Sequence, residues 1–235
     1  MRPLVYLHPA GGLRRTPVLE DLATLRELHT PVFPGFDGTA ADAAIRSRKA
    51  LAHWTAKVVE KIGAPCDVMG SSFGGAVALW LALERPELVD HLVLEAPAGL
   101  QTIDAALRKD PQAFRAALYA HPENVAAETK TLEIQVQNRK MLAHYGAEDG
   151  RDAELAARLG EIAHPALVLH GTEDRIITAA SMQFLKHSLR RAYLVYVWDA
   201  AHNIEVDQPR RMSALVKAFL ERSEAFVVNR GKGGA

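Results

Sequence analysis

Short apolar runs rich in β-branched residues alternate along the chain with longer amphipathic segments. Such runs predict strands at residues 4–7, 31–33, 66–69, 91–95, 166–169 and 193–198. Between them, apolar residues recur at three- and four-residue spacing, as in a predicted helix over 39–62. This alternation predicts an α/β fold with a doubly wound, mostly parallel sheet of about six strands and helices on both faces.

The alternation stops over residues 100–162. This stretch is rich in Ala, Glu, Arg and Leu, and it is interrupted at Pro111 and Pro122. We therefore predict an all-helical insertion there. The predicted α/β core then consists of residues 1–99 and 163–228, with 225–228 a further candidate for an edge strand. Residues 229–235 are polar and rich in glycine, so we expect a disordered tail.

Residues 70–75 read Gly-Ser-Ser-Phe-Gly-Gly, directly after a predicted strand and directly before a predicted helix. A tight turn at this position holds a serine hydroxyl out at the end of a sheet, next to the N–H groups that begin the helix. Ser72 is the candidate nucleophile, because glycines occupy both crowded flanking positions, Gly70 and Gly74. If Ser71 were the nucleophile, the flanking positions would be Met69 and a phenylalanine, whose side chains would not fit there. An idle serine in a glycine-rich turn is the alternative.

A serine hydroxyl becomes a good nucleophile when a base takes its proton, and the base needs an acid partner. Two later strands end in suitable residues: 170–176 include Asp174, and 199–203 include His202. Both positions belong at the carboxyl edge of the sheet, where Ser72 is expected. The rival acids are Glu173, Asp199 and Glu95.

In five ordered motifs the chain resembles the α/β-hydrolase superfamily, and in particular its esterase-like serine hydrolases with a helical cap. The matching segments are 7–12, 34–39, 70–75, 169–176 and 201–209. The resemblance implies a catalytic triad of Ser72, Asp174 and His202, in the chain order serine, acid, histidine. Asp174 is preferred to Glu95 because the segment 171–176 gives the closer match.

The resemblance also implies an oxyanion hole, formed by the backbone N–H of Phe73 and that of Ala10 in the loop after the first strand. Gly11 is the alternative donor, since Pro9 follows His8 where the family usually has glycine. The family usually has an antiparallel strand pair ahead of this loop. Here the sequence starts at the oxyanion strand, so we expect a shortened sheet of six parallel strands.

In this family the stretch between the fourth and fifth of these strands is a helical cap over the active site, and residues 100–162 fill that place. Candidate substrate-pocket residues are Phe36, Phe114, Tyr119 and Met141, for which packing within the protein is the alternative. The mixed wall favours a small to medium, mostly apolar acyl or ester substrate. We expect the cap to set substrate choice and to leave the chemistry to the sheet loops.

The leading interpretation is therefore a serine carboxylesterase that acts through an acyl-enzyme. The same triad also suits a C–C bond hydrolase of ring-cleavage products, a thioesterase or a lactonase, and a ligand receptor built on the hydrolase fold is a further alternative. Haloalkane dehalogenation needs an aspartate nucleophile, so Ser72 argues against it.

Composition narrows the partners. The 235 residues include 28 Lys plus Arg and 28 Asp plus Glu, with no basic run interleaved with aromatics, which argues against nucleic acid. No apolar stretch approaches the roughly 20 residues of a membrane span.

With Cys66 as the single cysteine, no internal disulfide can form, and we expect a cytoplasmic protein. No metal-ligand motif, dinucleotide fingerprint or phosphate-binding loop is present, so we expect no metal or cofactor and a small-molecule substrate. The sequence leaves the oligomeric state open.

Overall fold

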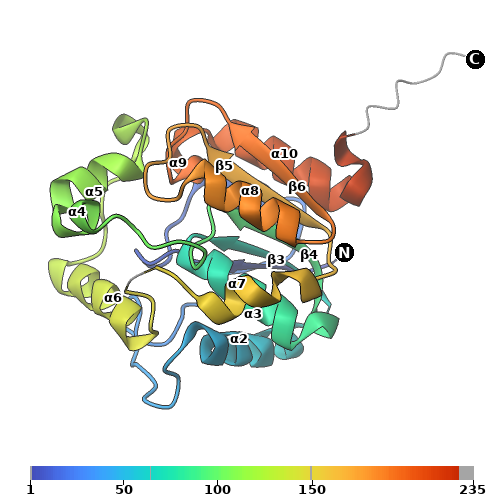
Figure 1. Ribbon diagram of the computed structural model, residues 1–235, viewed down its shortest axis with the longest axis horizontal. Helices are drawn as coiled ribbons and strands as arrows, with labels where there is room; N and C mark the ends of the chain where they lie inside the picture. The colour runs from blue at the N-terminus through green and yellow to red at the C-terminus, as the bar shows by residue number, and fades with distance from the viewer. Residues whose placement is uncertain (1, 64, 149, 228–235) are drawn as a thin grey trace, which may run out of the picture.

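Six strands form the central sheet of the computed structural model, which describes residues 2–63, 65–148 and 150–227 (Figure 1). The strands are β1 (Leu4–Leu7), β2 (Leu28–His29), β3 (Cys66–Ser71), β4 (Val89–Glu95), β5 (Ala166–Gly171) and β6 (Ala192–Val197). Their order is β2-β1-β3-β4-β5-β6, and all five neighbouring pairs are parallel. This confirms the predicted doubly wound sheet.

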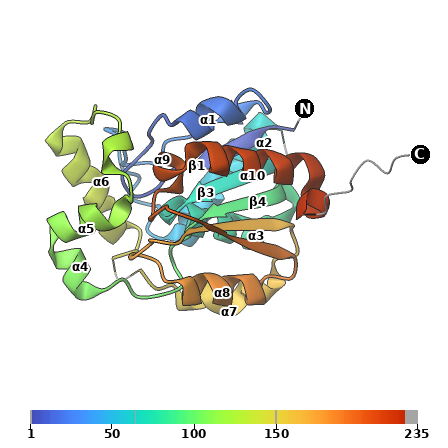
Figure 2. The same cartoon turned by 90° about the horizontal axis from the view of Figure 1, so that it is seen from above.

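The α-helices follow the strands in the alternating order that the sequence predicts. They are α1 (Pro17–Leu22), α2 (Arg48–Ile62), α3 (Phe73–Glu84), α4 (Ala105–Lys109), α5 (Pro111–Leu118), α6 (Leu132–His144), α7 (Ala153–Arg158), α8 (Ala179–Ser188), α9 (Ile204–Asp207) and α10 (Pro209–Arg222). Alternate strand residues point to opposite faces, so each face has its own apolar cluster. One cluster includes residues of α2, α3, α7 and α8, and the other includes residues of α1, α9 and α10; Figure 2 shows α10 and α8 on opposite sides of the sheet.

The direction in which successive strands are added across the sheet reverses between β1 and β3, although the two strands are parallel. From β1 the chain moves outward to β2, then returns across β1 to continue through β3 to β6. In open parallel sheets ligands bind outside the carboxyl ends of the strands at such a switch point. The loop after β1 and the turn after β3 therefore flank the expected site.

Between β4 and β5 the chain forms α4 to α7, as the sequence predicts for a helical insertion. Helices α4, α5 and α6 gather at one end of the molecule in both views (Figures 1 and 2). The Asn203 N–H donates to the Leu118 carbonyl at 3.0 Å, which ties the end of α5 to the loop after β6. The end of α5 therefore lies at the carboxyl edge of the sheet, whereas α7 packs with α2, α3 and α8 on one face of it.

Three local predictions are wrong. The second strand is Leu28–His29 rather than 31–33, because the Phe33 N–H donates to the His8 ring at 3.1 Å instead of joining a strand. Helix α2 begins at Arg48 with Ser47 as its N-cap, not at residue 39, since Thr39 bonds back into the preceding turn. Residues 225–227 belong to a 3₁₀ helix rather than an edge strand. There Phe226 packs edge-on against Phe219. The predicted tail, 229–235, lies outside the described residues.

Within 2–63, 65–148 and 150–227, no helix is both long enough and apolar enough to cross a bilayer.

Candidate active site

Ser72 occupies the sharp turn between β3 and α3, in a backbone conformation (φ 50°, ψ −110°) that non-glycine residues rarely adopt. A Cβ atom on Gly70 would collide with the Gly74 carbonyl, and one on Gly74 would collide with the Leu7 carbonyl. The two glycines are therefore needed for the turn and for its close approach to β1. Ser72 N–H donates to the Glu95 carbonyl at 2.8 Å, which anchors the turn to the end of β4.

His202 lies between Ser72 and Asp174. Its Nε2 is 2.9 Å from Ser72 Oγ, and its Nδ1 is 2.9 Å from Asp174 Oδ2. The His202 side chain is almost completely buried and that of Asp174 is fully buried, whereas Ser72 is partly exposed. The structure thus brings together the three residues that the sequence selected, with the serine accessible to a ligand.

The other Asp174 oxygen accepts two backbone N–H bonds, from Ile176 at 2.8 Å and from Ile177 at 2.9 Å. Burial favours the neutral carboxyl, but the charge of His202 and these donors together hold the Asp174 pKa below its ordinary value. Burial also disfavours the imidazolium, yet the attraction and hydrogen bond of Asp174 outweigh it and raise the His202 pKa. Asp174 is therefore equipped to keep the Nδ1 proton in place and to stabilise a charged His202.

The rival acids lie elsewhere. Glu173 is exposed, and Asp199 is 2.9 Å from His121. Glu95 is buried below the site, where its Oε1 accepts the Glu205 N–H at 3.0 Å and makes no hydrogen bond to His202. Among the four acids that the sequence put forward, Asp174 alone contacts the His202 ring by hydrogen bonding.

The loop after β1 turns back beside the elbow. The Gly12 N–H closes a turn by donating to the Pro9 carbonyl at 3.0 Å, and the Leu13 N–H donates to Asp37 at 2.7 Å. Neither Ala10 N–H nor Gly11 N–H donates to any of the residues that the structure describes. Both of these N–H groups therefore stay available to a ligand, as does that of Phe73, the first residue of α3.

His8 shapes this loop. Because the Phe33 N–H donates to His8 Nε2, the ring proton is assigned to Nδ1, which lies 2.8 Å from the Pro9 carbonyl oxygen. Burial lowers the His8 pKa to about 4, so the ring is neutral near pH 7. Both ring nitrogens of the neutral His8 are therefore hydrogen-bonded to the backbone, and its single ring proton is held by the Pro9 carbonyl, so His8 supports the turn.

Comparisons with known proteins agree with this geometry. The alpha/beta hydrolase family matches residues 4–215. The chain belongs to the α/β-hydrolase family. A 2-hydroxymuconate semialdehyde hydrolase from Pseudomonas sp. (strain CF600) is 28% identical, over 97% of this chain and 89% of the relative. A pimeloyl-[acyl-carrier protein] methyl ester esterase from Nitrosomonas europaea is 28% identical, over 79% of this chain and 81% of the relative.

A solved structure shares the fold. The meta-cleavage product hydrolase from Pseudomonas fluorescens IP01 superimposes with a TM-score of 0.79 and 18% identity, covering 94% of this chain and 91% of that chain. Relatives of this α/β hydrolase thus include both a semialdehyde hydrolase and a methyl ester esterase.

The candidate pocket residues of the hydrolase differ in their surroundings. Phe36 is fully buried, and its ring stacks on Tyr145 at 6.3 Å and contacts Phe73 at 5.8 Å between centroids. Met141 is buried against Gly35, and the Tyr119 hydroxyl accepts a hydrogen bond from Arg14 at 2.6 Å. Phe114 on α5 is half-buried. Phe36 therefore packs against Phe73 at the elbow, and Met141 on α6 packs against the adjacent Gly35.

The sequence named Glu95 only as a rival acid and did not indicate that it pairs with a second buried carboxyl group, Glu205. Glu205 is 3.2 Å from the Tyr6 hydroxyl, and its own N–H bonds Glu95. Burial and mutual repulsion raise the Glu95 pKa, and burial raises that of Glu205 against the opposing effect of the Tyr6 hydrogen bond. Nothing in the local sequence indicates the pair, since its members are 110 residues apart.

Asp207 also has a structural role that its motif alone did not reveal. Its carboxylate accepts N–H bonds from Ala201 at 2.7 Å and from Ala120 and His121 at 2.9 Å each. It therefore holds the histidine loop against the chain that follows α5.

Among the described residues, one group has metal-ligand geometry: Asp67, Asp90 and His91. Asp67 pairs with Arg26 at 3.1 Å, and Asp90 pairs with Arg2. His91 Nε2 lies 2.9 Å from the Ser223 hydroxyl. These existing partners account for the cluster as an ion-pair network at the amino end of β3 and β4, remote from Ser72.

Proposed function

We propose that this α/β hydrolase is a serine hydrolase that cleaves a small to medium, mostly apolar carboxylic ester through an acyl-enzyme intermediate. The observation that carries the proposal is the position of His202, 2.9 Å from both Ser72 Oγ and Asp174 Oδ2. A histidine in that place can take the serine proton at Nε2 while Asp174 holds the proton on Nδ1.

In the proposed reaction Ser72 Oγ attacks the ester carbonyl carbon as its proton passes to His202. The oxyanion of the tetrahedral intermediate receives hydrogen bonds from the Phe73 N–H and from Ala10 or Gly11 in the loop after β1. His202 then protonates the leaving alcohol, which departs and leaves the acyl group on Ser72. Water activated by the same histidine hydrolyses the acyl-enzyme.

A fluorophosphonate probe tests the nucleophile, because only a base-activated hydroxyl beside an oxyanion hole reacts readily with it. We expect peptide mapping to find the adduct on Ser72, and we expect His202→Ala to prevent labelling while the fold remains intact. Labelling of Ser71, or no labelling of a folded preparation, would contradict the proposal.

C–C bond hydrolysis of a ring-cleavage product is the second candidate, favoured by the Pseudomonas relative that matches 97% of this chain. The two functions separate when a series of p-nitrophenyl esters is assayed beside a ring-fission dienoate. Turnover of the esters with kcat/KM well above that of the dienoate supports the first candidate, and the reverse ranking supports the second. Stoichiometric binding without repeated turnover would instead indicate a receptor.

Residues 100–162 are proposed as the cap that sets substrate choice. Substitution of Phe114, Tyr119 or Met141 should shift the chain-length preference in kcat/KM by about 1–3 kcal/mol for each contact altered, the usual scale for an apolar pocket. An acyl-chain series on each variant measures the shift, and labelling of Ser72 should survive.

A further inference from the structure

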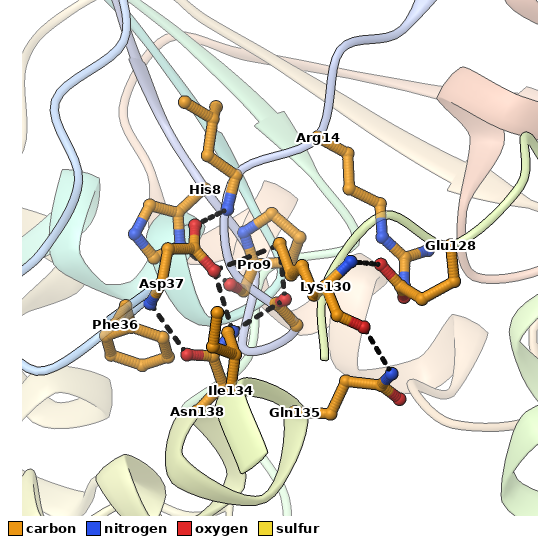
Figure 3. Close-up of polar contacts among 12 residues, drawn as sticks. His8, Pro9, Arg14, Phe36, Asp37, Glu128, Lys130, Ile134, Gln135 and Asn138 are labelled. Carbon is orange, nitrogen blue, oxygen red and sulfur yellow. Dashed lines mark hydrogen bonds and ion pairs between the residues drawn. The ribbon is translucent and has the colours of Figure 1, made fainter. Parts of the chain in front are cut away.

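The loop after β1 contains consecutive glycines, Gly11 and Gly12, and Gly12 has a φ of +84°. Glycine backbones reach many conformations, so a loop of this composition needs outside contacts to hold one of them. Some of those contacts come from Asn138 on helix α6 and from Lys130, two residues before that helix, as Figure 3 shows. The donors are more than 110 residues from the loop in sequence.

Asn138 on α6 is 1% exposed, and each of its amide hydrogen-bonding groups has a partner. Its Nδ2 donates to the Gly11 carbonyl at 3.0 Å and to Asp37 Oδ1 at 2.8 Å, while its Oδ1 accepts the Asp37 N–H at 2.8 Å. Removal of this amide would leave the Asp37 N–H without its partner and the Gly11 carbonyl and Asp37 carboxylate with one donor fewer, in a closely packed place.

Asp37 connects the helix to the loop from the other side. Its Oδ2 accepts the Leu13 N–H at 2.7 Å, and its Oδ1 is 3.0 Å from Lys130 Nζ. Burial opposes its charge, but Asn138, the Leu13 N–H and Lys130 lower the Asp37 pKa. Lys130 Nζ also donates to the Gly11 carbonyl at 2.8 Å, so that carbonyl has two donors.

The backbone of Asp37 is unusual for its residue type, with φ at +51°, where glycine is favoured. A Cβ atom on Gly12 would collide with the Asp37 carboxylate and with the Asn138 amide. The aspartate side chain is thus accommodated at a position that suits glycine and is packed directly against the loop.

We propose that Asn138, Asp37 and Lys130 are positioning residues that fix the oxyanion loop from the helical segment. Asn138 and Lys130 hold the Gly11 carbonyl, and Asp37 holds the Leu13 N–H. Together they fix the Gly11–Gly12 peptide, which limits rotation at Gly11 and sets the direction of the Ala10 and Gly11 N–H groups. Helix α6 therefore controls the rate of the chemical step, in addition to carrying Met141, a residue proposed for the substrate pocket. This inference rests on the proposed function, and it changes the expectation that the segment 100–162 leaves the chemistry to the sheet loops.

Two variants remove the contacts in different ways. Asn138→Ala deletes the amide, and Asp37→Gly deletes the carboxylate while it relieves the positive φ. We expect each to lower kcat by about tenfold to a hundredfold for every ester in a chain-length series, less than the usual loss of an oxyanion donor itself. KM and the chain-length preference should remain near those of the parent chain, and labelling of Ser72 should slow in proportion to kcat.

Amide hydrogen exchange provides a readout that does not depend on activity. Peptides that cover residues 8–14 should exchange faster in both variants, because the Gly11 carbonyl loses one of its two donors in Asn138→Ala and the Leu13 N–H loses its acceptor in Asp37→Gly. Arg139→Ala, an exposed neighbour on α6, is the matched control and should leave kcat, labelling and exchange unchanged.

The outcomes separate the two proposals. If the folded parent chain is not labelled at Ser72, the proposed function fails and this inference fails with it. If the parent is labelled and both variants keep kcat and exchange at residues 8–14 within twofold of the parent values, the positioning role alone is wrong. A changed chain-length preference at unchanged kcat would assign Asn138 to the substrate pocket instead.

Discussion

Asp174 and Glu95 are both buried carboxyl groups close to His202, yet their surroundings prepare them for opposite charge states. Asp174 accepts two backbone N–H bonds and faces the His202 ring at 2.9 Å, and its pKa is lowered. Glu95 accepts one N–H through Oε1, has no hydrogen-bond partner for Oε2 among the described residues, and lies beside Glu205, and its pKa is raised. Burial alone therefore does not decide whether a carboxyl group is ionised. The charges beside it, His202 for Asp174 and Glu205 for Glu95, and the donors aimed at it act together with burial.

The difference between the two acids has a functional consequence. An ionised carboxylate can orient His202 and stabilise its positive charge, whereas a protonated one cannot. The sequence placed Glu95 among the rival acids because it follows β4 directly. Its partners in the folded chain make it a neutral support beneath the elbow, where its carbonyl accepts the Ser72 N–H.

The largest expected effect separates the acids by activity. Asp174→Asn should lower kcat by about 10⁴-fold, because the amide favours the wrong His202 tautomer and cannot stabilise the imidazolium. Glu95→Gln should keep kcat within about tenfold of the parent value, a small effect in transition-state terms. Steady-state ester hydrolysis measures both. An active Asp174→Asn beside an inactive Glu95→Gln would show that the acid is Glu95.

The pH dependence of the unfolding free energy also distinguishes Glu95 from Asp174, because a raised pKa and a lowered pKa change stability in opposite directions as pH rises. A raised pKa in the folded state gives stability that is fully present below the unfolded value, about 4.3 for Glu, and that is lost as pH rises through the folded value. Between these two values the parent chain should lose stability that Glu95→Gln retains. We expect the stability advantage of the glutamine variant to be small, about 1 kcal/mol, at pH 5 and to grow to about 4 kcal/mol at pH 8.

Urea unfolding across this pH range measures the difference. Glu173→Gln, at an exposed position, is the control and should follow the parent curve. A parent stability that rises from pH 5 to pH 8 relative to Glu95→Gln would show that Glu95 is ionised in the folded chain.

A substitution of Tyr6 tests the hydrogen bond that this residue makes to Glu205. Its hydroxyl lies 3.3 and 3.2 Å from the two Glu205 oxygens, and this hydrogen bond lowers the Glu205 pKa against the effect of burial. Tyr6→Phe should cost about 1 kcal/mol of unfolding free energy, with a larger loss at pH values where Glu205 is ionised, because bonds to charged groups are stronger. An unchanged thermal midpoint at pH 8 would contradict this.

The sequence predicted the parts of the site whose signals are local. Ser72, Asp174 and His202 each lie in a short motif at the end of a strand, and the turn chemistry of Gly70 and Gly74 identifies Ser72 in preference to Ser71. The doubly wound, mostly parallel sheet of about six strands followed from the alternation of apolar runs. The positions of these three candidate residues could therefore be predicted from the sequence alone.

Contacts between segments that are distant in the sequence could not be predicted. The pairing of Asn138 with Gly11 and of Glu205 with Glu95 joins residues more than 100 apart in the chain, and each side chain looks ordinary in its own segment. The second strand was misplaced for a related reason, because Phe33 bonds a histidine side chain contributed by the loop after β1. Hydrogen bonds between distant segments leave no periodic pattern in the sequence from which they could be predicted.

The smallest expected effect measures how far Glu95 acts on the triad. Asp174 raises the His202 pKa most, and the charge of Glu95 adds to it. Activity depends on a neutral His202, so kcat/KM should fall as pH decreases through this raised pKa. Removing the Glu95 charge should move that acid limb to lower pH, by a few tenths of a unit, because Glu95 carries only a partial charge in the range where His202 titrates. The pH profile of kcat/KM for Glu95→Gln, with Glu173→Gln as control, measures the shift. A shift to higher pH would mean that the neutral amide stabilises the imidazolium better than Glu95 does, and the contrast between the two acids would then be wrong in its electrostatics.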